Sequence, residues 1–196
     1  INRGLGGDTL LGLKSRIKFD EENENHCYII QIGTNDLLLP FLKEYSRNWR
    51  MQIKRIVKSG RVPCKDKENF RNEYEDLVIQ LIEKKKKFIT INIPCIGEDL
   101  DSLLNKEVDR YNIVIKELAS KYKFKCVDFN NWQKQMLAKS QHEDKYFISK
   151  KPYKTVLDTV STTILPMSNY ISLRRGLLIT IDGCHLNDIG AHGLAN

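Results

Sequence analysis

Long apolar runs are missing from this sequence. No stretch approaches the roughly 20 consecutive apolar residues that a membrane-spanning helix requires, so the sequence predicts no helical membrane span. A signal peptide is not visible either. The sequence opens at Ile1 without an initiator methionine. We therefore expect the natural N-terminus to lie upstream, and the missing signal assigns no compartment by itself.

Cysteines at metal-binding spacing are also missing. The cysteines are odd in number and scattered, at positions 27, 64, 95, 126 and 184. No pair has the close spacing of a zinc site, and no other cofactor is indicated. We expect Cys27, Cys95 and Cys126, which lie in or beside apolar runs, to be small core residues. This usage indicates a reducing compartment, which favours a cytoplasmic location.

Aromatic residues are not interleaved with the basic ones. The formal net charge is +7, and the densest basic run is Lys84 to Lys87. This charge is compatible with nucleic acid or an anionic surface as a partner, but a platform for stacking bases needs aromatic side chains among the cations. Because cations suit the C-terminus of a helix, we interpret the lysine run as a solvated helix end and predict no nucleic-acid partner.

The sequence does contain an alternation of strand-like and helix-like segments. Its 196 residues are 41% hydrophobic and 29% charged, which fits one globular domain over residues 1–196. Buried strands are predicted at 27–32, 88–94 and 124–129, and helices at 9–17, 38–58, 69–86 and 99–122. The alternation predicts an α/β fold with a parallel sheet and right-handed crossovers.

Residues 130–175 depart from this alternation. The segment is rich in hydroxyl-bearing residues and contains Trp132, Tyr146 and Tyr153. We interpret it as an insertion with one or two helices. Insertions at the carboxyl edge of a sheet often form a lid or a substrate wall.

Residues 179–187 are the most informative stretch. An apolar run at 177–181, interpreted as a buried strand, ends at Asp182, and His185 follows three residues later. At that spacing the carboxylate can hold one ring nitrogen of the imidazole and leave the other to accept a proton. The alternative is structural. Asp182 would then cap the helix that begins near Asn187, beside a partly buried histidine.

Two glycine-containing turns come earlier in the chain. Gly6 and Gly7 lie in a turn that leads into the first helix, and they allow a backbone N–H to face a ligand. Asn35 follows the first predicted strand, where open α/β sheets place ligand-binding groups. The alternatives are an ordinary loop capped by Asp8 or Thr9, and a cap or Asx-turn at Asn35.

Three blocks of this sequence resemble the SGNH (GDSL-type) hydrolase family. The family's second block is similar to NRGLGGDT at 2–9, its third to GTND at 33–36, and its last to DGCHLN at 182–187. The helix around 107–112 is similar as well. The blocks occur in the family's order, and the resemblance covers nearly the whole chain except 130–175. It implies a three-layer α/β/α sandwich with a parallel, flavodoxin-like sheet.

The resemblance also implies an activity. It is the hydrolysis of an ester through a serine acyl-enzyme, with a small-molecule or carbohydrate-borne acyl ester as substrate. His185 would be the general base, and Asp182 would orient it. Gly7 would donate its backbone N–H, and Asn35 its side-chain amide, to the oxyanion. Such chemistry needs donors that do not titrate and a base that can be tuned near neutral pH.

The family's first block, Gly-Asp-Ser after the first strand, is missing here. Residues 7–12 imitate it with Thr9 in place of serine. We reject Thr9 as the nucleophile because no apolar strand precedes it. The nucleophile is therefore unknown, and we expect the first strand, the first helix and the second strand of the fold to lie upstream of Ile1. Without the first strand, the remaining sheet would have an unpaired apolar edge.

Competing functions follow from this gap. The leading hypothesis is an ester hydrolase, and its main rival is a non-catalytic ligand-binding module that keeps the cleft but lacks the nucleophile. A third hypothesis is a binder of nucleic acid or anionic surfaces, driven by the charge of +7. The insertion offers another source of a nucleophile in Ser161, Ser168 and Ser172.

Overall fold

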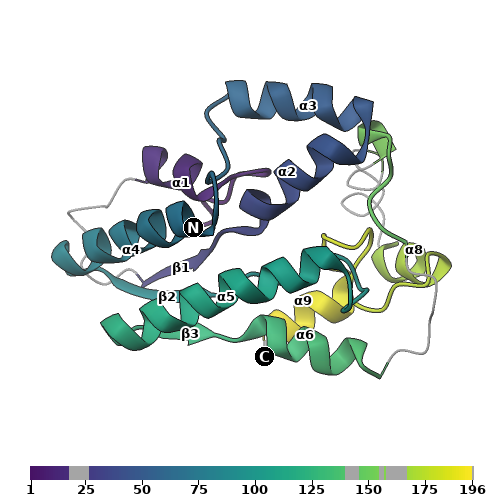
Figure 1. The fold of residues 1–196 in the computed structure, drawn as a ribbon. Helices are drawn as coiled ribbons and strands as arrows, with labels where there is room; N and C mark the ends of the chain where they lie inside the picture. The colour runs from purple at the N-terminus through teal and green to yellow at the C-terminus, as the bar shows by residue number, and fades with distance from the viewer. Residues whose placement is uncertain (18–26, 140–145, 155–156, 158–166, 196) are drawn as a thin grey trace.

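The computed structural model describes residues 1–17, 27–139, 146–154, 157 and 167–195. Within them the chain forms a sheet of three parallel strands with the order β1-β2-β3. The strands are β1 (Cys27–Gln31), β2 (Lys87–Ile91) and β3 (Lys125–Val127). The register pairs Ile29 with Ile89 and Ile91 with Val127. Helices connect each strand to the next (Figure 1), so the predicted parallel α/β arrangement is confirmed.

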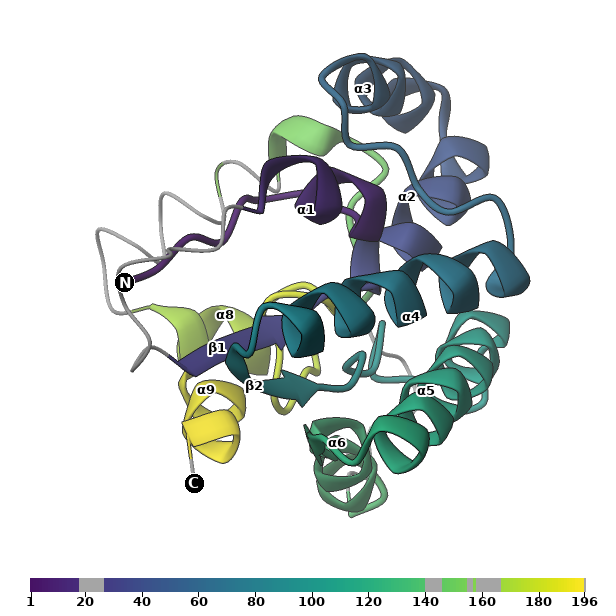
Figure 2. The ribbon, with the colours of Figure 1, turned by 90° about the vertical axis from the view of Figure 1, so that its left-hand side faces the viewer.

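Helices cover both faces of this sheet. Their bounds are α1 (Leu10–Arg16), α2 (Thr34–Tyr45), α3 (Arg47–Lys58), α4 (Lys67–Glu83), α5 (Leu103–Tyr122), α6 (Phe129–Leu137), α8 (Ser168–Arg174) and α9 (Asp188–Ala195). Figure 2 shows α4 on one side of the strands and α6 and α9 on the other. The sheet is therefore the middle one of three layers.

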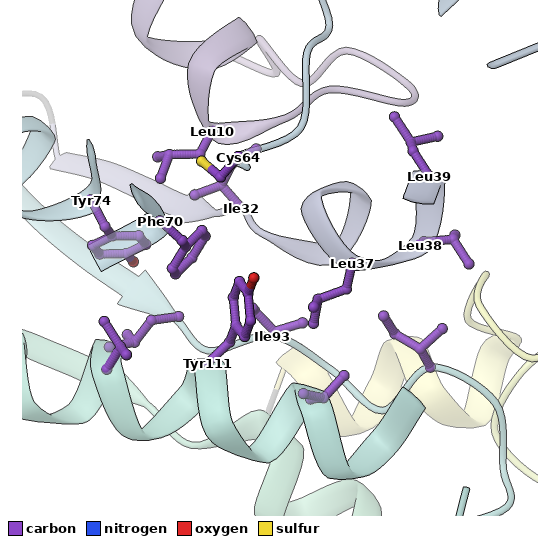
Figure 3. Packing of buried hydrophobic residues seen from close by; sticks show 14 of the residues in the cluster. Leu10, Ile32, Leu37, Leu38, Leu39, Cys64, Phe70, Tyr74, Ile93 and Tyr111 are labelled. Atoms are coloured by element: carbon purple, nitrogen blue, oxygen red, sulfur yellow. The ribbon is translucent and has the colours of Figure 1, made fainter. Parts of the chain in front are cut away.

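The main hydrophobic core lies on the side of α4 and α5. Figure 3 shows Leu10 of α1, Phe70 of α4 and Tyr111 of α5 gathered near Ile32, which follows β1. The rings of Phe70 and Tyr111 are 4.8 Å apart. Burying side chains of this size stabilises the fold by about 1.5–3 kcal/mol each. This core fixes the short segment after β1, where one of the predicted site residues lies.

A smaller core lies on the other face of the sheet. It contains Cys95, Leu137 and Ile179, with Trp132 packed against it. Ile179 is fully buried and lies just ahead of Asp182. The second core therefore fixes the segment that carries the other predicted site residues.

The helix predicted at 38–58 is divided into two. α2 begins at Thr34, earlier than predicted, and α3 begins after Ser46. Ser46 has an extended backbone (φ −158°, ψ 156°), and its hydroxyl accepts the backbone N–H of Trp49 at 3.2 Å. Such an N-cap satisfies an amide that has no partner within its helix. Helical periodicity alone does not reveal it.

Two predicted strands also differ from the structure. The strand predicted at 124–129 ends at Val127, because Asp128 caps α6 and accepts the N–H of Asn131 at 3.3 Å. Residues 177–181 are largely buried, as predicted, but they form no strand. They make a single bridge, between Thr180 and Leu186.

The described part of the segment 130–175 contains most of α6 and all of α8. Residues 140–145, 155–156 and 158–166 lie outside the described residues. Phe129 and Leu137 of α6 are buried, so the beginning of this segment packs into the domain. The single domain at 1–196 and the extent of its insertion stay predictions.

β1 forms an open edge of the sheet. Within the described part of the chain, only β2 pairs with it. Ile29 is 70% exposed at the middle of β1, and Cys27 is exposed as well, so the prediction that Cys27 is a core residue is wrong. A cavity of about 790 Å³ lies between β1 and the N-terminal residues 1–5. The expected unpaired apolar edge is present.

Candidate active site

Asp182 and His185 form a hydrogen-bonded pair. The Oδ2 atom of Asp182 lies 2.9 Å from Nδ1 of His185. The other carboxylate oxygen, Oδ1, accepts the backbone N–H groups of Cys184 at 3.0 Å and of His185 at 2.9 Å. The geometry expected from the spacing of these two residues is confirmed. The carboxylate holds both the ring and the backbone of the histidine.

Burial and hydrogen bonding act in opposite directions on Asp182. Burial alone would raise the pKa of this carboxyl group, but the hydrogen bond and charge of the His185 ring, with the two backbone N–H groups, outweigh it. The pKa of Asp182 therefore lies below its ordinary value of 3.8. An ionised carboxylate only accepts hydrogen bonds, so Nδ1 of His185 carries a proton. In the neutral ring, Nε2 is then the basic nitrogen.

The structural alternative for Asp182, a cap on the following helix, is wrong. α9 begins at Asp188. The residue that satisfies its first turn is Asn187, whose Oδ1 atom accepts the N–H of Gly190 at 3.0 Å. The carboxylate of Asp182 is instead directed at His185, whose side chain is 62% exposed. The ring is therefore accessible to a substrate.

Asn35 lies in the first turn of α2. Its Nδ2 atom donates to the carbonyl oxygen of Asp8 at 2.9 Å, which places the amide beside Gly7. One N–H of the amide is used in this bond, and the second can serve a ligand. Gly33, the N-cap of α2, has φ 113°, and a Cβ there would lie 2.7 Å from the side chain of Ile93. Only glycine lets the chain turn into α2 at this point.

The turn at Gly7 is held from the outside by Arg61. Gly7 has φ 76°. The Nη1 atom of Arg61 donates to the carbonyl oxygen of Gly6 at 2.9 Å. The carbonyl of Gly6 and the N–H of Gly7 belong to one trans peptide and point in opposite directions. Arg61 therefore turns the N–H of Gly7 away from itself.

Asp36 joins the two segments that carry Gly7 and Asn35. Its buried carboxylate accepts the N–H of Leu10 at 2.9 Å and that of Cys64 at 2.8 Å. Burial raises the pKa of Asp36 above its ordinary value, although these hydrogen bonds lower it in part. The start of α1 is thus fastened to the start of α2.

The candidate site has two halves: Gly7 with Asn35, and Asp182 with His185. Both lie at the carboxyl edge of the sheet. Asn35 follows β1, while the loop after β2 reaches the Asp182–His185 turn, since Gly97 donates its N–H to the carbonyl of Gly183 at 2.6 Å. Parallel strands place such loops together.

Phe147 connects these two halves. Its ring makes edge contacts with Phe41 and Tyr45 of α2, at centroid distances of 5.7 and 6.1 Å. The same ring lies against Gly97 and Gly183, where an added Cβ would come within 3.1 and 2.9 Å of it. One side chain therefore contacts the helix that carries Asn35 and the turn that carries His185.

The hydroxyl groups of Thr9 and Ser172 are hydrogen-bonded away from His185. Thr9 is fully buried, and its Oγ1 accepts from Gly12 and donates to the carbonyl of Val62 at 2.8 Å. Ser172 is buried, donates to the carbonyl of Ser168 and accepts from Asn187 at 3.0 Å. None of these contacts involves His185.

Ser168, the second serine of the predicted insertion, is also buried. Ser161 lies outside the described residues. The described hydroxyls of the insertion therefore do not support it as a source of the nucleophile.

Among the described residues, no group of three or more His, Cys, Asp and Glu side chains could hold a metal ion. No helix in the described part of the chain is both long and apolar enough to cross a membrane.

Sequence reasoning missed two contributors to this site. Arg61 lies in a loop with no motif, and its contact with Gly6 spans 55 positions of the chain. The second contributor is the loop after β2, where the sequence predicts only the end of a strand. Gly97 and Glu98 of this loop, like Arg61, carry no local sequence signal, because each acts on a partner distant in sequence.

The comparisons with known proteins concern the family and the fold. The model of the GDSL-like Lipase/Acylhydrolase family matches residues 1–191. No curated protein sequence matches the chain. Among solved structures, the acetyl xylan esterase AlAXEase is 18% identical with a TM-score of 0.61, over 98% of this chain and 75% of that one.

Two further solved structures are similar to the chain. Axe2, an acetylxylan esterase from Geobacillus stearothermophilus, is 18% identical with a TM-score of 0.62, over 100% of this chain and 68% of that one. LAE5, an α/β hydrolase enzyme from the metagenome of Lake Arreo, Spain, is 16% identical with a TM-score of 0.59, over 100% of this chain and 68% of that one. At these identities the likeness shows the fold.

Proposed function

The chain belongs to the GDSL-like lipase/acylhydrolase family of carboxylic-ester hydrolases, and from that premise we propose that it hydrolyses acyl esters through a Ser–His–Asp triad. The observation that carries the proposal is the 2.9 Å contact between Asp182 Oδ2 and His185 Nδ1. A buried carboxylate in this position fixes the tautomer that a general base needs.

In the proposed reaction, Nε2 of His185 takes the proton of a serine hydroxyl as the oxygen attacks the ester carbonyl. The tetrahedral intermediate collapses when His185 returns the proton to the departing alcohol, which leaves an acyl-serine. A water molecule then attacks the acyl group, and His185 again takes and returns one proton. The products are the carboxylic acid and the restored serine. Asp182 stays ionised and stabilises the imidazolium in both steps.

The oxyanion of each tetrahedral intermediate is assigned to the N–H of Gly7 and the side-chain amide of Asn35. The support for this assignment is the contact of Asn35 with Asp8, the residue after Gly7, and the orientation that Arg61 gives to the Gly6–Gly7 peptide. Donors that are fixed before the reaction stabilise developing charge without reorganisation.

The nucleophile, in this proposal, is a serine on a segment ahead of Ile1 that pairs with the open edge of β1. Three observations support this placement. Ile29 is largely exposed at the middle of that edge, the cavity of about 790 Å³ runs along it, and Asp8 and Asn35 line the same cavity. A strand laid there would cover Ile29 and end beside the oxyanion donors.

The proposed substrates are small acyl esters, including acetyl groups borne by carbohydrates. The support is the structural likeness to proteins described as acetyl xylan esterases. Release of acetate from acetylated xylan and from p-nitrophenyl acetate would compare the two kinds of alcohol directly.

The deciding experiment measures hydrolysis of p-nitrophenyl acetate by residues 1–196 alone and by a version extended upstream through a Gly-Asp-Ser strand. We expect turnover only in the extended version, and its loss on His185→Ala. The matched control is His192→Ala, an exposed histidine on α9. An extended protein that binds acetylated carbohydrate without turnover would instead support a non-catalytic binding module.

A further inference from the structure

Glu98 is a buried carboxylate that faces the segment leading to Asp182. It lies in the loop after β2 and is only 1% exposed. Its Oε2 atom accepts the N–H of Leu178 at 2.7 Å, and its Oε1 atom accepts the N–H groups of Ile179 at 2.9 Å and Thr180 at 2.8 Å. Three consecutive peptide groups are thus fastened to one side chain.

The hydroxyl of Thr180 extends this connection toward His185. It donates to Oε1 of Glu98 at 2.7 Å, and the hydroxyl oxygen of Thr180 itself accepts the N–H of Gly183 at 3.2 Å. Gly183 lies between Asp182 and His185. The carbonyl of Gly183 accepts the N–H of Gly97, the residue before Glu98, at 2.6 Å. Gly183 is therefore held at its N–H by Thr180, whose hydroxyl binds Glu98, and at its C=O by Gly97.

The loop that carries Glu98 is itself held by buried side-chain amides. Asn112 makes two hydrogen bonds of 2.8 Å to the backbone of Ile93, and Gln133 accepts the N–H of Cys95 at 2.7 Å. Asn105 accepts the N–H of Ile96 at 2.9 Å and donates to the carbonyl groups of Gly97 and Asp99 at 3.1 and 2.7 Å. Glu98 thus projects from a support with little freedom to move.

A neutral side chain at position 98 would lose less hydration free energy on burial than the carboxylate of Glu98 does. Burying a carboxylate is expensive unless it is fully hydrogen-bonded. Hydrogen bonds to a charged acceptor are about twice as strong as neutral ones. A purely packing role therefore does not explain the charge, whereas the need to hold one backbone segment in one position does.

We propose that Glu98 is a positioning residue for the base. Its carboxylate fixes residues 178–180 and, through the hydroxyl of Thr180, the Asp182–His185 turn, so that the imidazole is held in the Nδ1–H tautomer. The inference rests on the proposed function only in treating His185 as the base. The contacts that it concerns are independent of the ester chemistry.

The test is Glu98→Gln, with Asp128→Asn as the matched control. Glutamine removes the negative charge of Glu98 and directs an N–H donor at backbone N–H groups that need an acceptor. Asp128→Asn makes the same change from carboxylate to amide at the cap of α6, which has no hydrogen bond to residues 178–185. The measurement is the two-bond ¹H–¹⁵N correlation of the His185 ring, which reports the tautomer, together with the water exchange of its Nδ1 proton.

In Glu98→Gln we expect a mixture of tautomers and exchange of the Nδ1 proton faster by about tenfold, the loss that corresponds to one hydrogen bond. The control should keep the single tautomer even where its melting temperature falls. If both variants keep the Nδ1–H tautomer and slow exchange, Glu98 is only a structural residue and the proposal fails.

Thr180→Val provides a second variant, for the case that Glu98→Gln does not fold. It keeps the carboxylate and its three backbone partners but removes the hydroxyl between Glu98 and Gly183. We expect the same loss of the single tautomer, and an unchanged His185 spectrum would overturn the proposal. In an active extended protein, either variant should lower kcat with little change in KM. If the unsubstituted extended protein shows no hydrolysis, the proposed function fails while the spectra still decide the role of Glu98.

Discussion

The side chain of Arg61 and the N–H of Gly7 lie on opposite sides of the Gly6–Gly7 peptide group. The guanidinium of Arg61 binds the carbonyl of Gly6 at 2.9 Å, and the N–H of Gly7 points the other way because the peptide is planar and trans. A side chain remote in sequence thus decides the direction of a proposed oxyanion donor. The partly buried guanidinium of Arg61 thus serves to orient this peptide group.

Replacing Arg61 should therefore impair the reaction without removing a donor. For Arg61→Met in an active protein we expect kcat to fall by about tenfold or more, less than the loss from removing an oxyanion donor, while KM changes little. The control is Arg110→Met, an exposed arginine paired within α5 to Glu107. Equal kcat in the two variants would show that the Gly6 carbonyl needs no such partner.

Asn35→Ala removes a proposed donor outright. We expect kcat for p-nitrophenyl acetate to fall by about 10²–10³-fold, as for other lost oxyanion donors. Asn169→Ala, on the exposed face of α8 with a bond to Asp188, is the control and should keep full activity. A loss below threefold for Asn35→Ala would remove this residue from the oxyanion site.

The free energy of unfolding should decrease at acidic pH because of Asp182. The pKa of Asp182 in the fold lies below its ordinary value of 3.8, so the fold favours the ionised form. The resulting stabilisation is fully present above about pH 5 and is lost as the pH falls through the folded pKa. Urea unfolding of the protein and of Asp182→Asn should therefore give a difference in free energy that narrows between pH 6 and pH 3. A difference that is constant over that range would contradict the assignment.

Gly190 leaves no room for a side chain. An added Cβ would lie 2.3 Å from the carbonyl oxygen of Ile179, a backbone atom next to Thr180. Gly190→Ala should lower the free energy of unfolding by about 1–3 kcal/mol, the usual cost of overpacking, although alanine favours helices. Gly6→Ala is the control, because nothing lies within 4 Å of its added Cβ. Chemical denaturation measures both, and equal stability would contradict the close contact.

The sequence predicted the pattern of the fold better than the supports of the site. Apolar runs predict the strands at 27–32 and 88–94 because buried parallel strands need apolar residues on both faces. The spacing of Asp182 and His185 predicts their hydrogen bond because the contact is local. Glu98 could not be predicted in the same way, since its partners lie 80 to 82 positions away. The sequence does not predict the break between α2 and α3 at Ser46, because an N-cap requires an extended backbone at one residue, which helical periodicity does not reveal.

The position of Phe147 has a consequence for how uniform the molecules are. The helix of Asn35 and the turn of His185 come from distant parts of the chain, and each could drift by itself. Because one ring contacts Phe41 and Tyr45 on one side and Gly97 and Gly183 on the other, a displacement of either half is transmitted to the other. The distance between the proposed donor and the proposed base then varies little from one molecule to the next. In the proposed reaction, such molecules would turn over with one rate constant, whereas a loosened contact would spread the rates of individual molecules.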